Sequence, residues 1–122
     1  MRAMLTTPAA EAFVKEWIDA WNSHDLERIL SHWEDDCEFT SPLVVKLMGD
    51  PAGKVVGKAA LRAYWTVGLE KNPDLHFTLQ TVYVGHDSVV IGYTNHRGVK
   101  CGEMLRLGAH GKAVAGVAHY AG

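Results

Sequence analysis

The spacing of the apolar residues changes at about residue 75, and that change restricts the fold more than any other feature. Before it, apolar residues recur every three or four positions, as in amphipathic helices. After it, they alternate as in half-buried strands, and short polar gaps separate the segments. Helices first and strands last indicate an α+β domain with antiparallel hairpins rather than a parallel βαβ sheet. The predicted strands are His76–Gly85, Ser88–His96, Lys100–Leu107 and Ala113–Tyr120.

Two helices are predicted before the first strand. Thr7 can cap the first, with Pro8 at its first helical position, and Asn22-Ser23 breaks it. Asp25 can cap the second. The buried stripe of the first helix is Phe13, Trp17, Ile18 and Trp21, and that of the second is Leu26, Ile29, Leu30 and Trp33.

The next segment is expected to hold a turn, a strand, a loop and a third helix. Glu34–Asp36 reads as a polar turn, and Cys37–Ser41 as a short strand that Pro42 stops. Glycine and proline within Val44–Val56 predict a mobile loop with room for one helical turn. Lys58–Lys71 is the third helix, and its apolar face is formed by Leu61, Tyr64, Trp65 and Leu69.

Length and composition limit the class of protein. A chain of 122 residues fits one domain, residues 1–122, which can bury a core without disulfides or metal. A net charge of −2 gives no electrostatic reason to expect nucleic acid or an anionic membrane as a partner. We find no secretory leader and no stretch near the ~20 apolar residues that span a bilayer, so we expect a cytoplasmic protein. Cys37 and Cys101 lack ligand spacing; free buried thiols are favoured, and a disulfide stays open.

Two motifs and the closing strands carry a family resemblance. W-x-x-x-W-N-x-x-D-L-x-x-I-L spans Trp17–Leu30, and G-K-A-A-L-R-A-Y-W spans Gly57–Trp65. Gly111-Lys112 precedes the last predicted strand. Over nearly the whole chain, these features resemble the NTF2-like superfamily, in its SnoaL-like polyketide cyclase and ketosteroid isomerase-like branch.

The resemblance implies a cone in which three N-terminal helices pack on a curved, mostly antiparallel sheet and enclose a cavity. It also implies a homodimer, because members often associate through the outer face of the sheet. Ala113–Tyr120 is apolar on both strand faces, which fits that expectation. Packing of both faces within one chain is the alternative.

The isomerase pattern implies three working positions in such a pocket. They are a tyrosine on the first helix, a base aspartate on the first strand and a protonated aspartate on a late strand. Aligned by eye, these positions hold Trp17, Ser41 and Glu103 here. Serine without a partner base cannot take a proton from carbon near neutral pH, and an indole is a weaker acid than a phenol. We therefore do not expect steroid-type isomerisation by the usual residues.

Glu103 is a candidate for chemistry on strand alternation alone. Its side chain shares a face with Cys101, Leu105 and Leu107, whereas Arg106 points the other way. A carboxylate on an apolar face is costly unless it is paired or protonated, and burial raises its pKa. Glu103 is therefore the predicted catalytic acid or base. A structural pairing with a neighbouring donor is the alternative.

Other side chains are candidates for binding a ligand. The aromatic group of Trp17, Trp21, Phe39, Tyr64 and Trp65 would either line a pocket for a ring-shaped molecule or form plain core. No histidine spacing matches a metal site, so we expect neither metal nor cofactor. The remaining predicted substrate-binding residues are Ser41, which would orient the substrate with Trp17, and Thr94, His96 and Tyr120, which would reach the cavity from strands.

Three functions follow, in descending order of preference. The first is an enzyme that carries out acid–base chemistry on a compact, apolar or ring-shaped substrate, as a cyclase, isomerase, dehydratase (a lyase) or epoxide hydrolase does. In it, Glu103 would carry the proton, helped by Tyr64, His96 or Tyr120. The second is a non-catalytic module that binds a ligand in its cavity. The third is a dimeric adaptor.

Overall fold

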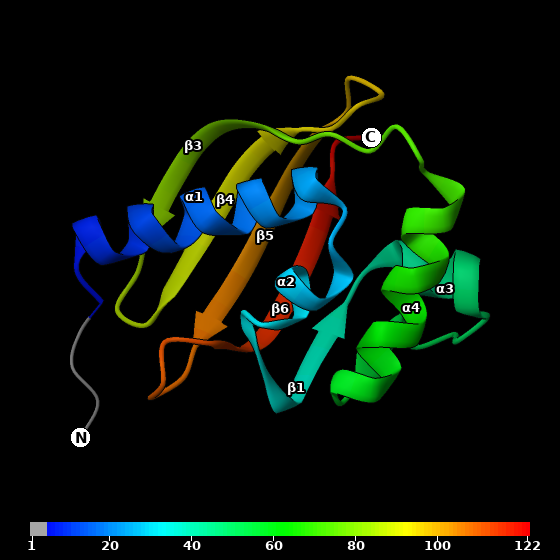
Figure 1. Cartoon of the computed structure of the whole chain (residues 1–122), viewed down its shortest axis with the longest axis horizontal. Coiled ribbons are helices and arrows are strands. Elements are labelled where there is room, and N and C mark those ends of the chain that lie inside the picture. Colours follow the sequence, from blue (N-terminus) through cyan, green and yellow to red (C-terminus); the bar gives the residue numbers. More distant parts are fainter. Residues whose placement is uncertain (1–4) are drawn as a thin grey trace.

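The computed structural model describes residues 5–122 as helices packed on a curved, open sheet of six strands (Figure 1). The strand order is β2-β1-β6-β5-β4-β3. β1 and β6 are parallel, and every other neighbouring pair is antiparallel. The predicted α+β class and mostly antiparallel sheet are therefore confirmed.

The first helix, α1, spans Thr7–Ser23. Its cap is Thr6 rather than Thr7, because the Thr6 side chain accepts a hydrogen bond from the Ala9 N–H at 3.3 Å. The predicted break at Asn22-Ser23 lies slightly too early. The helix ends at His24, which adopts the left-handed conformation with φ 61°.

The second helix, α2, is shorter than predicted and spans Leu26–Leu30, capped by Asp25 as expected. Trp33 does not belong to it. Trp33 begins strand β1, Trp33–Thr40, where it pairs with Ala113 of β6. The predicted turn at Glu34–Asp36 is also strand, and it lies where the pairing of β1 with β6 shifts register.

The region predicted as a mobile loop is largely regular. Ser41 caps a helix, α3, that spans Pro42–Met48, and strand β2 spans Lys54–Val56. The loop prediction was wrong because β2 finds a partner at the edge of β1. With α4 at Lys58–Lys71, as predicted, the described residues form four helices rather than the expected three.

The later strands are close to their predicted positions. β5, Lys100–Leu107, and β6, Ala113–Tyr120, have the expected bounds. β3 spans Thr78–Val84, and β4 spans Ser88–Thr94. His76 and His96 therefore lie outside the strands that were expected to contain them.

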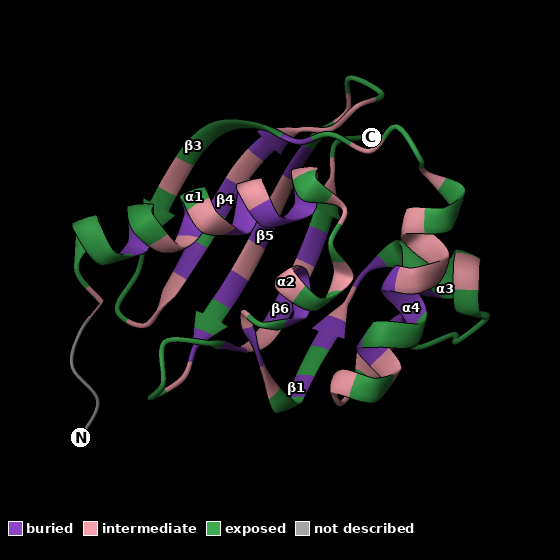
Figure 2. Cartoon of the chain, in the orientation of Figure 1, coloured by how far each residue is buried: buried purple, intermediate pink, exposed green. Residues whose placement is uncertain are grey.

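Buried residues gather on the helix-facing side of the sheet (Figure 2). Along β5, Cys101, Glu103, Leu105 and Leu107 are all buried, as the alternation predicted. The other side carries exposed Tyr83 and Val90 among other residues of β3 and β4. Dimerisation through this outer face stays a prediction. Within residues 5–122, no helix has the length and apolar character needed to cross a membrane.

Side chains of the neighbouring strands β1 and β5 leave no room for a side chain at Gly116 of β6. A Cβ there would lie 2.6 Å from the Trp33 ring, 2.9 Å from Leu105 and 3.0 Å from Phe39. Gly102 of β5 is a matched control, because a Cβ there would meet nothing within 4 Å.

We expect Gly116→Ala to lower the free energy of unfolding by about 1–3 kcal/mol, since overpacking forces buried rings to shift. Gly102→Ala should change it by less than about 0.5 kcal/mol. Urea unfolding of both variants measures the difference. Equal free energies for the two variants would contradict the close packing at Gly116.

Candidate functional site

A partly open cavity of about 290 Å³ lies between the helices and the sheet. Its lining is mostly apolar, with a few polar groups, as in small-molecule sites. The lining residues are Trp21, Leu43, Leu47, Tyr64, Trp65, Gly68, Asn72, Leu75, Phe77, Tyr93, Asn95, His96, Arg97, Val99, Glu103 and Tyr120.

The sheet topology brings the polar part of this lining together. β1 and β6 run parallel, so the end of β1 at Thr40 and the end of β6 at Tyr120 lie at the same end of the sheet. β5 is antiparallel to its neighbours and begins there, with Cys101 opposite Tyr120 and opposite Tyr93 of β4. Segments far apart in the sequence therefore meet at one end of the sheet.

Glu103 is the buried acid of the cavity. Its side chain lies on the inner face of β5, between Ile91 of β4 and Ala118 of β6, and the residue is 6% exposed. The Tyr93 hydroxyl donates a hydrogen bond to Glu103 Oε1 at 2.7 Å. Burial raises the pKa of Glu103 to about 7, although the hydrogen bond from Tyr93 acts in the opposite direction. Glu103 can therefore hold or release a proton near neutral pH.

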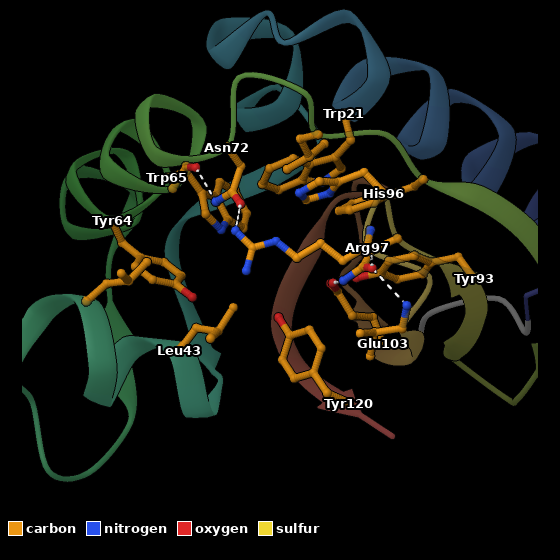
Figure 3. A pocket seen from close by; sticks show the side chains of 16 residues that line it. Trp21, Leu43, Tyr64, Trp65, Asn72, Tyr93, His96, Arg97, Glu103 and Tyr120 are labelled. Carbon is orange, nitrogen blue, oxygen red and sulfur yellow. Dashed lines mark hydrogen bonds between the residues drawn. The ribbon is translucent and has the colours of Figure 1, made fainter. Parts of the chain in front are cut away.

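Three phenol groups line the cavity together with this carboxyl group: Tyr93 and Tyr120 lie near Glu103, and Tyr64 lies across the pocket (Figure 3). Burial is the main cause that raises the pKa of Tyr93, Tyr64 and Tyr120, and the negative charge of Glu103 raises each further. All three hydroxyls keep their protons near neutral pH and are hydrogen-bond donors. The nearby Ser41 side chain partly offsets the rise in the pKa of Tyr64 and of Tyr120.

Aromatic rings form the wall opposite the acid. The Trp21 ring meets the Trp65 ring edge to face, with centroids 4.9 Å apart, and lies 5.6 Å from the Phe77 ring. Phe77 in turn lies 4.3 Å from the Tyr93 ring. Such a wall suits a flat or ring-shaped ligand, because offset and edge contacts between rings are favourable.

The end of α1 holds the segment before β3 in place. The Asn22 side chain accepts from the Phe77 N–H at 2.7 Å and donates to the Phe77 carbonyl at 2.9 Å. His24 Nε2 lies 2.7 Å from the Leu75 carbonyl oxygen. Two lining residues, Leu75 and Phe77, are thus fixed by side chains of the helix end rather than by a neighbouring strand.

Six of the ten predicted site residues line the cavity: Trp21, Tyr64, Trp65, His96, Glu103 and Tyr120. Their roles stay predictions. The structure places the other four outside the lining. Trp17 packs behind it, 5.8 Å from the Phe77 ring, and Phe39 lies in the core against Trp33 and Trp65.

Ser41 and Thr94 miss the lining for different reasons. Ser41 is 1% exposed, and its hydroxyl accepts from the Leu43 N–H at 3.2 Å as the cap of α3. Thr94 pairs with Thr78 and Lys100 on the outer face. His96 was also expected to reach the cavity from a strand, but β4 ends at Thr94, so His96 lines the cavity from the turn that follows.

Sequence reasoning missed several lining residues, above all Tyr93, Asn72 and Arg97. A signal for Tyr93 was present. The β4–β5 hairpin pairs it with Cys101, so it lies diagonally beside Glu103 on the same face. Asn72 and Arg97 lie at a helix end and in a turn, where no periodic pattern indicates direction.

The rim of the cavity is polar. Arg97, in the turn after β4, extends across the pocket, and its Nη2 donates to Asn72 Oδ1 at 3.0 Å (Figure 3). Beside it, both ring nitrogens of His96 are buried without a hydrogen-bond partner among the described residues. In residues 5–122, His, Cys, Asp and Glu nowhere gather in threes that could hold a metal ion, and Cys37 and Cys101 are free thiols.

Comparison with known proteins gives a consistent set of relatives. Residues 14–121 match the model of the SnoaL-like domain. A SnoaL-like protein of unknown function from Burkholderia thailandensis is 43% identical, with a TM-score of 0.93, covering 98% of this chain and 99% of the other. No curated protein is significantly similar.

More distant structures share the fold. One is a candidate isomerase of the SnoaL-like family from Agrobacterium tumefaciens, 17% identical with a TM-score of 0.75, covering 95% of this chain and all 100% of the other. Another is a candidate ketosteroid isomerase from Kribbella flavida, 13% identical with a TM-score of 0.74, covering 95% and 80%. At these identities the likeness concerns the fold alone.

The raised pKa of Glu103 predicts a pH-dependent stability. The pKa is about 7 in the folded chain against an ordinary 4.5, so between these values the folded state binds more protons than the unfolded state. The contribution of Glu103 is therefore most favourable at low pH and is lost as pH rises through about 7. The span of the shift corresponds to about 3 kcal/mol.

Glu103→Gln removes this titration. We expect the unfolding free energy of the variant, relative to the unchanged chain, to rise by up to about 3 kcal/mol from about pH 4 to about pH 8. Urea unfolding at a series of pH values measures it, and other titrating groups cancel in the difference. Parallel profiles for the two proteins would show that Glu103 has no raised pKa.

Proposed function

The chain belongs to the SnoaL-like domain family, and we propose that it is an enzyme that moves a proton on a compact, ring-containing small molecule by non-covalent acid–base catalysis. The family match confirms the resemblance that Trp17–Leu30 and Gly57–Trp65 indicated. The observation that supports catalysis most directly is the Glu103 carboxyl group, which lies buried in the cavity wall with a pKa of about 7.

A group with this pKa can act in both directions at neutral pH. The Glu103 carboxylate takes a proton from a carbon next to a carbonyl group, and the electron pair of the broken C–H bond moves into an enolate. The protonated Glu103 then returns the proton to another carbon of the same system, so that the enzyme ends the cycle unchanged. General acid–base catalysis is most efficient when the pKa of the group is near the working pH.

The phenols supply the complementary part of this chemistry. Tyr93 donates to Glu103 Oε1 and is therefore a positioning residue, because it holds the carboxyl group in place. Tyr64 and Tyr120 line the cavity and keep their protons near neutral pH, so they can donate to the oxygen on which negative charge develops. These donors take over the role for which Trp17, buried behind the lining, is unsuited.

The walls select the kind of substrate. Trp21, Trp65 and Phe77 present ring faces and edges to the cavity, which fits a flat or cyclic molecule of modest size. The departure from the steroid isomerase pattern at Trp17 and Ser41 supports a different reaction site within the same fold. The carboxyl group that works here is Glu103 rather than an acid at the end of β1.

Exchange of hydrogen for deuterium tests the proposal without knowledge of the natural substrate. The compact ring ketones 2-tetralone and 2-indanone exchange protons next to their carbonyl groups in D2O, which NMR follows directly. We expect the protein to accelerate exchange, and Glu103→Gln to reduce the acceleration at least a hundredfold, on the order of general-base contributions. Glu38→Gln makes the same chemical change on an exposed residue of β1 and should leave the rate unchanged.

Two results would contradict the proposal, and each would lead to a different conclusion about the cavity. If Glu103→Gln exchanges as fast as the unchanged protein, another group carries the proton. If the ketones bind, as shifts of the cavity amides would show, but do not exchange, the cavity is a binding site without this chemistry.

Tyr93→Phe should move the pH profile of the exchange. The hydrogen bond from Tyr93 lowers the pKa of Glu103, so its loss raises that pKa above about 7. The active base is the carboxylate, so the midpoint of the rate profile should shift to higher pH and the rate at neutral pH should fall. A profile of rate against pH for both proteins measures the shift; an unchanged midpoint would remove Tyr93 from the mechanism.

A further inference from the structure

We propose that the cavity binds a ring compound that carries a carboxylate, and that Arg97 and His96 at the cavity rim bind that carboxylate while the aromatic wall holds the ring. The inference rests on the proposed function and narrows its substrate to a class, the small ring carboxylates. Three observations at the rim support it.

The first is an arginine without a carboxylate partner. Arg97 extends across the pocket, and its hydrogen bond goes to the amide oxygen of Asn72 at 3.0 Å (Figure 3). Among residues 5–122, no acidic side chain forms an ion pair with it. A guanidinium group has five N–H donors in a planar fork that matches a carboxylate, so most of its capacity is available to a ligand.

The second is a histidine whose side chain is largely buried and whose ring has no hydrogen bond. The His96 side chain is 10% exposed, it lines the cavity, and neither Nδ1 nor Nε2 has a hydrogen-bond partner within the described chain. The Asp74 carboxylate lies 3.7 Å from Nε2, beyond hydrogen-bond distance, and is 79% exposed, so water screens it. Buried polar atoms without partners are rare in native proteins, and a ligand acceptor would satisfy this ring.

The third is the neighbouring indole of Trp21. It lines the same cavity, and its buried Nε1 also has no partner in the described residues. An indole N–H and a guanidinium group can only donate hydrogen bonds. Donors from Trp21, His96 and Arg97 therefore call for a ligand group that accepts several hydrogen bonds, and a carboxylate does so with two oxygens.

Glu103 does not repel the carboxylate of the ligand below about pH 7, because its own carboxyl group then keeps its proton. The volume of about 290 Å³ leaves room for a small ring system beside the carboxylate. Trp65 and Phe77 supply the apolar contacts for that ring.

A matched pair of probes separates charge from shape: 2-naphthoate and its neutral amide, 2-naphthamide. Dissociation constants are measured at about pH 6, where Glu103 holds its proton, from the shifts of backbone amides that line the cavity in ¹⁵N-labelled protein. The variants are Arg97→Gln, the charge-conserving Arg97→Lys and His96→Gln. Arg106→Gln is the control, because it removes the same charge from an exposed position on the outer face of β5.

We expect naphthoate to bind at least tenfold more tightly than naphthamide, as a charge-assisted pair with arginine implies. Arg97→Gln should remove most of this preference, His96→Gln part of it, and Arg97→Lys should retain part of it. Arg106→Gln should keep the whole preference.

Equal affinity for the two probes, or a preference that survives Arg97→Gln, would overturn carboxylate recognition and leave the ring-binding cavity of the proposed function standing. If neither probe shifts the amides of the cavity, the proposed function itself fails, and this inference with it.

Discussion

The parallel pairing of β1 with β6 is the contact on which the rest of the architecture depends. It joins the helical half of the chain to the final strand. At Gly116 of β6, the rings of Trp33 and Phe39 from β1 leave no space for a side chain. Because the two strands are parallel, Ser41, which caps α3, and Tyr120, the last residue of β6, lie at the same end of the sheet. A different orientation of β1 would separate the helical wall of the cavity from the residues that face it.

The low polarity at this end of the sheet determines the protonation of Glu103 and the hydrogen bonding of the groups near it. Glu103 lies between β4 and β6 and accepts a hydrogen bond from the Tyr93 hydroxyl. Its negative charge also raises the pKa of Tyr64 and Tyr120. A carboxyl group in water would be fully ionised at neutral pH, whereas here burial balances the two forms. The same exclusion of water leaves His96 and Trp21 with unpaired nitrogens at the rim. Burial therefore accounts both for the raised pKa of Glu103 and for the nitrogens of His96 and Trp21 that lack hydrogen bonds.

Much of the fold could be predicted because the apolar pattern is strong: the bounds of α4, β5 and β6 and the inward direction of Glu103 follow from periodicity alone. The region from Trp33 to Val56 could not, because its structure depends on pairing with distant strands rather than on local preference. The site divides in the same way. Five of the six lining residues that were predicted lie on helices and strands, and His96 lies in the turn after β4. Asn72 and Arg97, at a helix end and in a turn, were missed, and so was Tyr93 on β4, whose direction only the β4–β5 pairing shows.

The two-way hydrogen bond of Asn22 with Phe77 resembles the exchange of bonds between neighbouring strands, made here by one side chain. It fixes a stretch of cavity wall that has no regular secondary structure of its own, and His24 fixes the same stretch at Leu75. A ligand bound as we propose would meet a part of the wall that is already ordered. Little conformational entropy would then be lost on binding, and more of the contact energy with the rings would be expressed as affinity.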